Sequence, residues 1–123
     1  MSYRCPACLR KAALEVSWWI ELPPDVRSDE ITLQLVGCPA CGFRGAVVYQ
    51  ESRRGALDAE SWEYDGYPVK VDALARLTQL IASCPDRGEP RCGCRAHREL
   101  GRQDAQGRWQ VPAEFGVRFT VEI

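Results

Sequence analysis

The chain has 123 residues, of which 46% are hydrophobic and 27% charged, and its formal net charge is −1. This composition is typical of one folded domain, with or without a small satellite, and does not indicate disorder. No apolar run approaches the roughly 20 residues of a membrane-spanning helix, and a cysteine motif at Cys5 leaves no room for a signal peptide. We therefore expect a cytoplasmic protein.

Three strands are predicted in the first half of the chain. The period-two pattern over 14–22 predicts a strand that ends at Pro23, a second strand runs from Ile31 into Cys38, and 45–51 forms a third. The adjacent residues Trp18 and Trp19 must point to opposite faces, so one is expected in the core and the other either exposed or covered by the C-terminal half. The predicted inward face of the first strand comprises Leu14, Val16, Trp18, Ile20 and Leu22.

The second half of the chain is less regular. Residues 52–67 predict a long polar connection with at most one short strand, and 72–83 predict a helix that Asp72 can cap. A helical turn over 95–100, a tight turn at Gln106-Gly107 and an alternating strand over 116–123 follow. The apolar stripe of the helix comprises Leu74, Leu77, Leu80 and Ile81.

These elements define the fold class as α+β. We expect a small antiparallel sheet with one helix and a second, metal-stabilised turn. Residues 1–52 are expected to form the sheet with the first metal site, and 53–123 to pack on it as one compact unit. Because the core is modest, stability is expected to depend on bound metal.

Seven cysteines and one histidine make up two complete sets of four metal ligands. Two Cys-Pro-Ala-Cys motifs form the first set. Each motif can turn two sulfurs toward a single point, and four such sulfurs suit structural zinc. Either motif alone would also fit a redox-active dithiol, but closely spaced cysteines in a reducing compartment favour metal. The first set comprises Cys5, Cys8, Cys38 and Cys41.

The second set lies within a short stretch of the C-terminal half and includes the only histidine. Alternate cysteines followed by a histidine can converge on one zinc, and a fourth cysteine at the helix end would complete the site. The alternative is that Cys84 belongs to the core while the other three side chains are exposed. The second set comprises Cys84, Cys92, Cys94 and His97.

The residues around the first set resemble a zinc ribbon. The run from Leu35 to Arg44, in which a strand enters Cys-Pro-Ala-Cys-Gly-Phe-Arg, is most similar to the ZPR-type zinc-finger proteins. The resemblance covers roughly residues 3 to 50 and implies a three-stranded sheet with one zinc. Leu9 departs from the family pattern, which has glycine at that position.

The same spacing also resembles rubredoxin, in which two such motifs hold one redox-active iron. Cys38-Pro-Ala-Cys-Gly fits that family, whereas Leu9-Arg10 and the alternating strand through Trp18 do not. Iron at the first site therefore stands as the alternative to zinc, with electron transfer as the implied function. A thiol-based redox switch is a further alternative.

The chain carries no pattern of a zinc hydrolase or deaminase. Glu89 and Glu99 lie near His97 but form neither His-x-Glu nor His-Glu-x-x-His. We therefore expect a non-enzymatic module with two structural zinc ions that binds a protein or a nucleic acid. The acidic pI of about 5.8 favours a protein partner. Arginines that could contact phosphate are Arg53, Arg54, Arg95, Arg98 and Arg102, although solvated surface charge is the commoner role.

Overall fold

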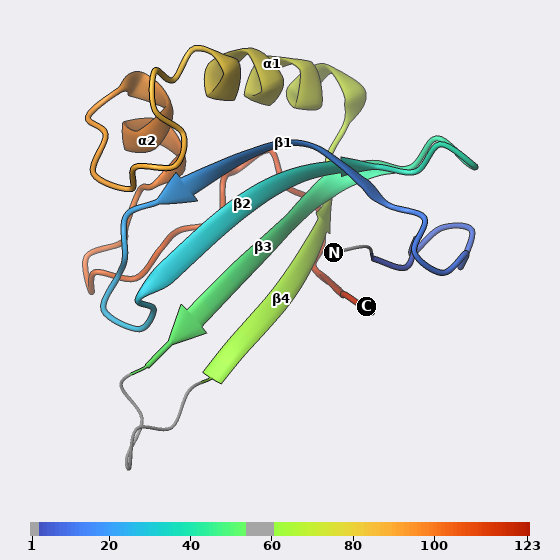
Figure 1. The fold of residues 1–123 in the computed structure, drawn as a ribbon, viewed down its shortest axis with the longest axis horizontal. Helices are drawn as coiled ribbons and strands as arrows, with labels where there is room; N and C mark the ends of the chain where they lie inside the picture. Colours follow the sequence, from blue (N-terminus) through green and yellow to red (C-terminus); the bar gives the residue numbers. More distant parts are fainter. Residues whose placement is uncertain (1–2, 54–60) are drawn as a thin grey trace.

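The computed structural model of the chain describes residues 3–53 and 61–123. Within these ranges, five strands form one antiparallel sheet in which each strand pairs with its neighbours in sequence (Figure 1). Two helices accompany the sheet, α1 (Val71–Ala82) and α2 (Arg95–Leu100), so the fold is α+β. The strands are β1 (Glu15–Leu22), β2 (Glu30–Gly37), β3 (Arg44–Ser52), β4 (Ser61–Pro68) and β5 (Phe119–Thr120).

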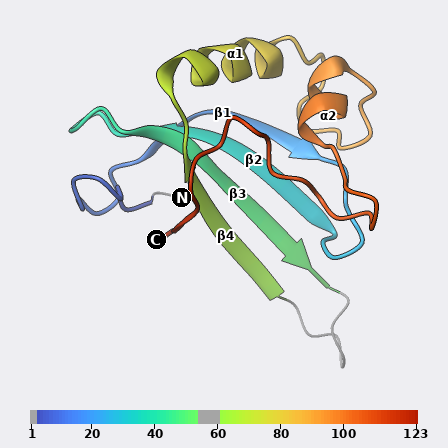
Figure 2. The ribbon, with the colours of Figure 1, turned by 180° about the vertical axis from the view of Figure 1, so that it is seen from behind.

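One face of the sheet, the helix-side face, carries most of the core. Helix α1 contacts β1 and β3, and α2 contacts β1. The chain between α2 and β5 crosses the same face, in front of the strands in Figure 2. Trp109 and Phe115 from this segment pack against the strands and α1. The core on this face includes Ile20, Leu22, Ile31, Leu33, Leu35, Ala46, Val48, Tyr67, Val69, Leu77, Leu80, Ile81, Cys84, Ala96, Leu100 and Trp109.

The opposite face, which we call the open face, has a smaller core at one end. This end carries both Cys-Pro-Ala-Cys motifs, because β1 and β3 begin there and β2 and β4 end there. Phe43 and Tyr64 pack at the margin of this core. Its buried members are Tyr3, Cys5, Leu14, Val36, Cys38 and Val47.

A β-bulge lets β1 contribute to both cores. The register pairs Val16 with Val36 and Trp18 with Leu35, so one extra residue of β1 lies between the two pairs. The extra residue moves all preceding side chains to the other face. Val16 is therefore on the open face, 40% exposed, and Leu14 lies in the smaller core. The prediction of one inward face along this strand is wrong for these two residues, because the sequence pattern does not show the bulge.

Helix α1 confirms the predicted helix and its apolar stripe. Leu77, Leu80 and Ile81 are buried, and Leu74 is partly buried against the same core. The predicted cap is wrong, because Lys70 occupies the N-cap position without a side-chain hydrogen bond. Asp72 lies in the first turn instead, where its negative charge still suits the helix dipole.

The C-terminal half differs from expectation at two strands. β4 (Ser61–Pro68) pairs with β3 along its whole length, where a connection with at most a short strand was predicted. The predicted strand over 116–123 is reduced to β5 (Phe119–Thr120), and Val117 is 87% exposed despite its place in the alternating pattern. The predicted α2 turn is confirmed, with Gly101 at its C-cap.

Two smaller points complete the fold. The turn at Gln106-Gly107 is confirmed: Gly107 has a φ of 80°, and a bridge between Gln103 and Trp109 closes the turn. In the part of the chain that the structure describes, neither helix has the length and apolar character needed to cross a membrane. Arg54 lies outside the described residues.

Candidate metal centres

The eight residues singled out in the sequence come together in the two predicted groups. In each group the four candidate ligand atoms lie within 4.8 Å of one another, so each group could hold a metal ion. All seven cysteines are free thiols. The first group joins the turn that precedes β1 to the turn that connects β2 and β3. The second group joins the C-terminal end of α1 to α2.

The sulfur spacing of the first group matches a tetrahedral metal site. The Sγ atoms of Cys5 and Cys41 are 3.5 Å apart, and those of Cys8 and Cys38 are 3.9 Å apart. Four sulfurs at about 2.3 Å from a central zinc are separated by about 3.8 Å along each tetrahedral edge. Cys5 and Cys38 are buried, whereas Cys8 and Cys41 are exposed. The metal position would therefore lie at the surface, anchored on its inner side by the smaller core.

The two Cys-Pro-Ala-Cys turns have the same backbone geometry. In each turn the amide of the first cysteine donates to the carbonyl five residues later, Arg10 or Phe43. The carbonyl of the same cysteine accepts from the residue four positions on, Leu9 or Gly42. Leu9 and Gly42 both have positive φ, 64° and 82°. The turn thus imposes a left-handed conformation at a position where the first motif carries leucine in place of glycine.

Two thiols of the first group, Cys5 and Cys41, differ widely in how readily they ionise. Burial would raise the pKa of Cys5, but hydrogen bonds from the amides of Cys8 and Ala7 and from nearby thiols outweigh it and lower the pKa to about 7. At Cys41 the amide of Phe43 lowers the pKa, yet lost solvation and the neighbouring thiols raise it to about 11. One thiol ionises readily, and its negative charge then opposes ionisation of the neighbouring thiol. A divalent metal would remove this conflict.

The second group is equally compact. The Sγ atoms of Cys84 and Cys92 are 3.9 Å apart, and Nδ1 of His97 lies 3.4 Å from Cys84 Sγ and 3.1 Å from Cys94 Sγ. In a tetrahedral zinc site with sulfur at about 2.3 Å and nitrogen at about 2.0 Å from the metal, the sulfur and nitrogen ligands are about 3.5 Å apart. Cys84 and His97 are buried. In the alternative interpretation the other three side chains are exposed; this part is wrong, since His97 is buried and Cys92 and Cys94 are half-buried, although Cys84 does belong to the main core.

His97 is oriented for metal binding through Nδ1. Its Nε2 lies 2.9 Å from the carbonyl oxygen of Glu21 in β1. A carbonyl only accepts, so Nε2 must carry the proton and Nδ1 presents its lone pair to the sulfurs. Metal-bound histidines are commonly held by such a hydrogen bond to a carbonyl. Sequence reasoning missed this contact, because a backbone carbonyl leaves no residue signature.

In the second group, too, the pKa of one thiol, Cys94, is lowered and that of another, Cys84, is raised. Burial opposes ionisation of Cys94, but the contact with the His97 ring, the hydrogen bond from the His97 amide and the nearby thiols outweigh it and lower the pKa of Cys94 to about 6. Burial and the adjacent cysteines raise the pKa of Cys84 to about 11, although the Asp86 amide works against them. This cluster is also suited to a cation.

The second group is attached to the edge of β1. The amide of Glu21 donates to the Arg87 carbonyl at 2.8 Å, while the Glu21 carbonyl accepts from His97. The Arg87 guanidinium lies 4.7 Å from the ring centroid of Trp18 and 5.2 Å from that of Trp19. Both predicted orientations are confirmed: Trp18 packs on the helix-side core, and Trp19 lies on the other face. Trp19 is 40% exposed, so the C-terminal half covers it only in part.

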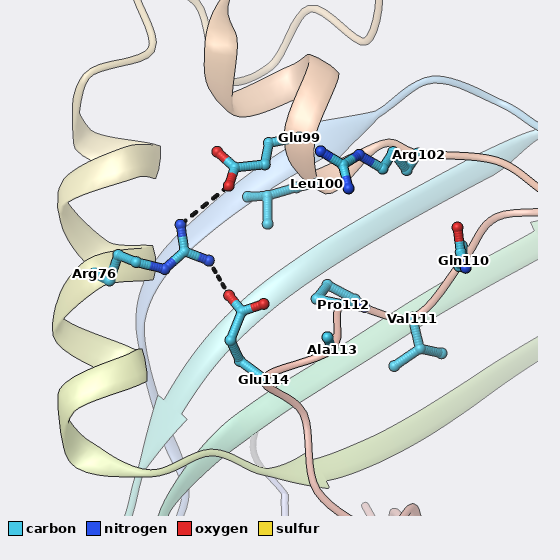
Figure 3. A pocket seen from close by; sticks show the side chains of 9 residues that line it. All are labelled: Arg76, Glu99, Leu100, Arg102, Gln110, Val111, Pro112, Ala113 and Glu114. Carbon is cyan, nitrogen blue, oxygen red and sulfur yellow. Dashed lines mark hydrogen bonds and ion pairs between the residues drawn. The ribbon is translucent and has the colours of Figure 1, made fainter.

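A separate cavity lies between α1, α2 and the segment over 110–114 (Figure 3). Its volume is about 170 Å³, and none of the eight candidate ligands lines it. Arg76 reaches across it and pairs with Glu99 at 3.1 Å and with Glu114. Glu99 also pairs with Arg95 at 3.5 Å. These ion pairs link α1, α2 and the segment over 110–114, and the Glu99 carboxylate pairs with two arginines.

The arginines considered for phosphate contact have roles within the protein. Arg53 pairs with Glu51 at 3.0 Å and with Glu30 at 3.7 Å. Arg98 donates to the Gly93 carbonyl at 3.1 Å. Arg102 is exposed beside the cavity of Figure 3. Among the described arginines of this set, Arg53 and Arg95 are therefore paired with carboxylates.

Comparison of the chain with protein-family models, curated proteins and solved structures found no match. The class that the fold and the two clusters define is thus a small α+β protein with two candidate metal-binding sites.

Proposed function

We propose that the protein is a non-enzymatic zinc-binding module, with two structural zinc ions, that serves as an adaptor for a protein partner. The observation that carries the proposal is the convergence of all eight soft ligands into two sets of four. Four protein ligands fill a tetrahedral zinc, whereas a catalytic zinc keeps one position for water. The resemblance of residues 3–50 to ZPR-type zinc ribbons supports zinc at the first site.

The position of each cluster supports a structural role. The first ties the turn before β1 to the turn before β3, and the second ties α1 and α2 to the edge of β1. Both links join segments that are distant in sequence. A metal in either place would therefore constrain the tertiary fold, as structural zinc does in small domains.

One observation favours a second candidate, an iron-based electron carrier of the rubredoxin type. Cys8 and Cys41 bring two sulfurs of the first site to the surface, and a tetrahedral four-sulfur site also accepts iron. Electron exchange would use this exposed side. The second site, with its histidine, has no counterpart in that scheme and is proposed as zinc under either function.

Elemental analysis of protein purified under reducing conditions tests the proposal. We expect two zinc per chain and a colourless protein. A red protein with one iron and one zinc would support the electron carrier instead. Protein that holds no metal even when refolded with excess zinc would overturn both metal-based functions.

Single substitutions assign the metals to their sites. Cys8→Ser and Cys92→Ser should each lower the metal content from two toward one per chain. The matched controls are Ser83→Ala, next to Cys84, and Ala40→Ser, between the two cysteines of the second turn. Both controls should retain two metals. Equal metal content in the cysteine variants and the controls would show that these thiols are not ligands.

A further inference from the structure

Beyond the pair Val16 and Val36, the register defines three cross-strand rows on the open face of the sheet. The first row begins with Trp19 of β1, which lies opposite Gln34 of β2. The second row contains Glu21, Thr32, Tyr49 and Tyr64, one from each of the strands β1 to β4. The third row contains Glu30, Glu51 and Trp62. The smaller core covers the end of this face near the first metal cluster and reaches Tyr64 of the second row, so the rest of that row and the third row lie beyond it.

This part of the face is rich in aromatic side chains that remain accessible. Trp62 is 60% exposed and Trp19 is 40% exposed, at opposite margins of the face. Between them, Tyr49 and Tyr64 are half-buried and lie with ring centroids 5.0 Å apart. Exposed tryptophans on a rigid sheet are characteristic of binding surfaces, because they contribute area at little entropic cost.

The same surface carries excess negative charge. Glu30 and Glu51 face each other directly across β2 and β3, an arrangement that costs stability in a sheet. Arg53 pairs with both, and Tyr49 donates to Glu51 at 2.6 Å. Glu21, on the adjacent strand, accepts from the Thr32 hydroxyl. Glu30 and Glu51 thus share one arginine among the described residues, and a cationic partner would complement them and the nearby Glu21 carboxyl group.

We propose that this surface, formed by Trp19, Glu21, Glu30, Tyr49, Glu51 and Trp62, docks an arginine- or lysine-containing segment of a partner protein. Cationic side chains would pair with the carboxylates and stack on the indole and phenol rings. The inference rests on the adaptor function proposed above and adds the chemistry of the partner. A nucleic acid is disfavoured here, because its phosphates would meet the glutamates.

The test uses the metal-loaded full chain and a short, fluorescently labelled peptide rich in arginine and lysine. Fluorescence anisotropy should show salt-sensitive binding, and an acidic peptide of equal length should not bind. The double variant Glu30→Gln/Glu51→Gln should bind the basic peptide about tenfold more weakly, from two weakened ion pairs. Trp62→Ala should weaken it by about threefold.

A matched double variant separates this surface from general acidity. Glu15→Gln/Glu63→Gln removes two carboxylates whose register positions belong to the helix-side face. Its affinity for the basic peptide should remain within twofold of that of the unmodified chain. Equal loss of affinity in both double variants would overturn the proposal, as would stronger binding of a single-stranded oligonucleotide of similar length.

The indole signals in an NMR titration locate the contact directly. The Trp62 and Trp19 indole N–H signals should shift with added peptide, whereas that of Trp109, which is buried and donates to the Leu100 carbonyl, should not. Peptide shifts confined to other residues would contradict the inference. Failure of this test with two zinc ions bound would leave the metal-binding function intact, whereas failure of the metal analysis would show itself before any peptide is added.

Discussion

Leu9 adopts a backbone conformation that leucine rarely takes. Its φ of 64° matches that of Gly42 in the second turn, and its side chain is 58% exposed. A left-handed conformation costs a residue with a Cβ about 1–2 kcal/mol, so Leu9→Gly should raise the free energy of unfolding by about 1 kcal/mol. Urea denaturation at a fixed excess of free zinc measures the change.

Leu9→Ala is the control, because it removes the same side chain while keeping a Cβ at positive φ. It should leave stability close to that of the unmodified chain. If the glycine and alanine variants were equally stable, the conformation at Leu9 would carry no strain.

The tautomer of His97 gives a second prediction at this scale. Because Nε2 donates to the Glu21 carbonyl, Nδ1 is expected to bind the metal. His97 is the only histidine in the chain, so its ring signals are unambiguous. In protein loaded with NMR-active cadmium, scalar coupling should appear at Nδ1, and the Nε2 proton should exchange slowly. Coupling at Nε2 would contradict the assignment.

At the scale of elements, the pairing of β3 with β4 depends on close backbone approach at Gly45. A Cβ at this position would lie 2.4 Å from the Tyr67 carbonyl oxygen. Gly45→Ala should therefore separate these strands near the first metal cluster and destabilise the protein by about 1–3 kcal/mol. Thermal unfolding of the metal-loaded protein measures the loss.

Gly37 provides the comparison, since it ends the neighbouring strand β2. A Cβ there would meet its nearest atom, the Phe43 carbonyl oxygen, at an ordinary 3.7 Å. Gly37→Ala should change stability far less than Gly45→Ala. Similar losses in both variants would mean that strand propensity, not the close approach, sets the effect.

The elements that the sequence predicts well are those whose periodicity the structure keeps. β2 and α1 present their main apolar sets to the helix-side core, so pattern and burial coincide there, and the apolar run of β3 is buried on both faces of the sheet. β4 was missed because Glu63 and Asp65 occupy helix-side positions while Trp62 and Tyr64 face the open side. Alternation of Trp62 and Tyr64 with acidic residues was the signal that could have identified it. The bulge in β1 leaves no such signal.

The candidate sites, too, have features that the sequence predicts and features that it does not. Ligand grouping was predictable because spacing along the chain brings paired cysteines together, and only one histidine was available. The contact between His97 and β1 and the carboxylates of the open face depend on register and tertiary packing. Neither can be derived from local pattern.

For the whole molecule, the two clusters should differ in how much structure they hold. The first lies against the smaller core, whereas Cys84, together with Ala96 and Leu100 of α2, belongs to the main core. Cys92→Ser should therefore reduce near-ultraviolet circular dichroism and cooperativity of unfolding more than Cys8→Ser. Neither thiol is fully buried, so lost packing contributes little to either variant.

The tryptophan signals make this comparison specific. Trp109 donates to the Leu100 carbonyl, and its amide donates to Asp25, so it reports on the cover of the helix-side face. Its signal should be lost in Cys92→Ser and retained in Cys8→Ser. The reverse order would show that the first cluster, not the second, holds the main core together.

The attachment of the second cluster to Glu21 bears on how the chain behaves in a crowded cell. β1 is the outer strand of the sheet, and Arg87 and His97 occupy the outward backbone groups of its Glu21. A chain emptied of this metal would present an unpaired strand rim flanked by two indole rings, the kind of surface that recruits further copies into aggregates. Loss of the metal would then favour edge-to-edge association of chains, whereas a bound metal would keep this rim covered.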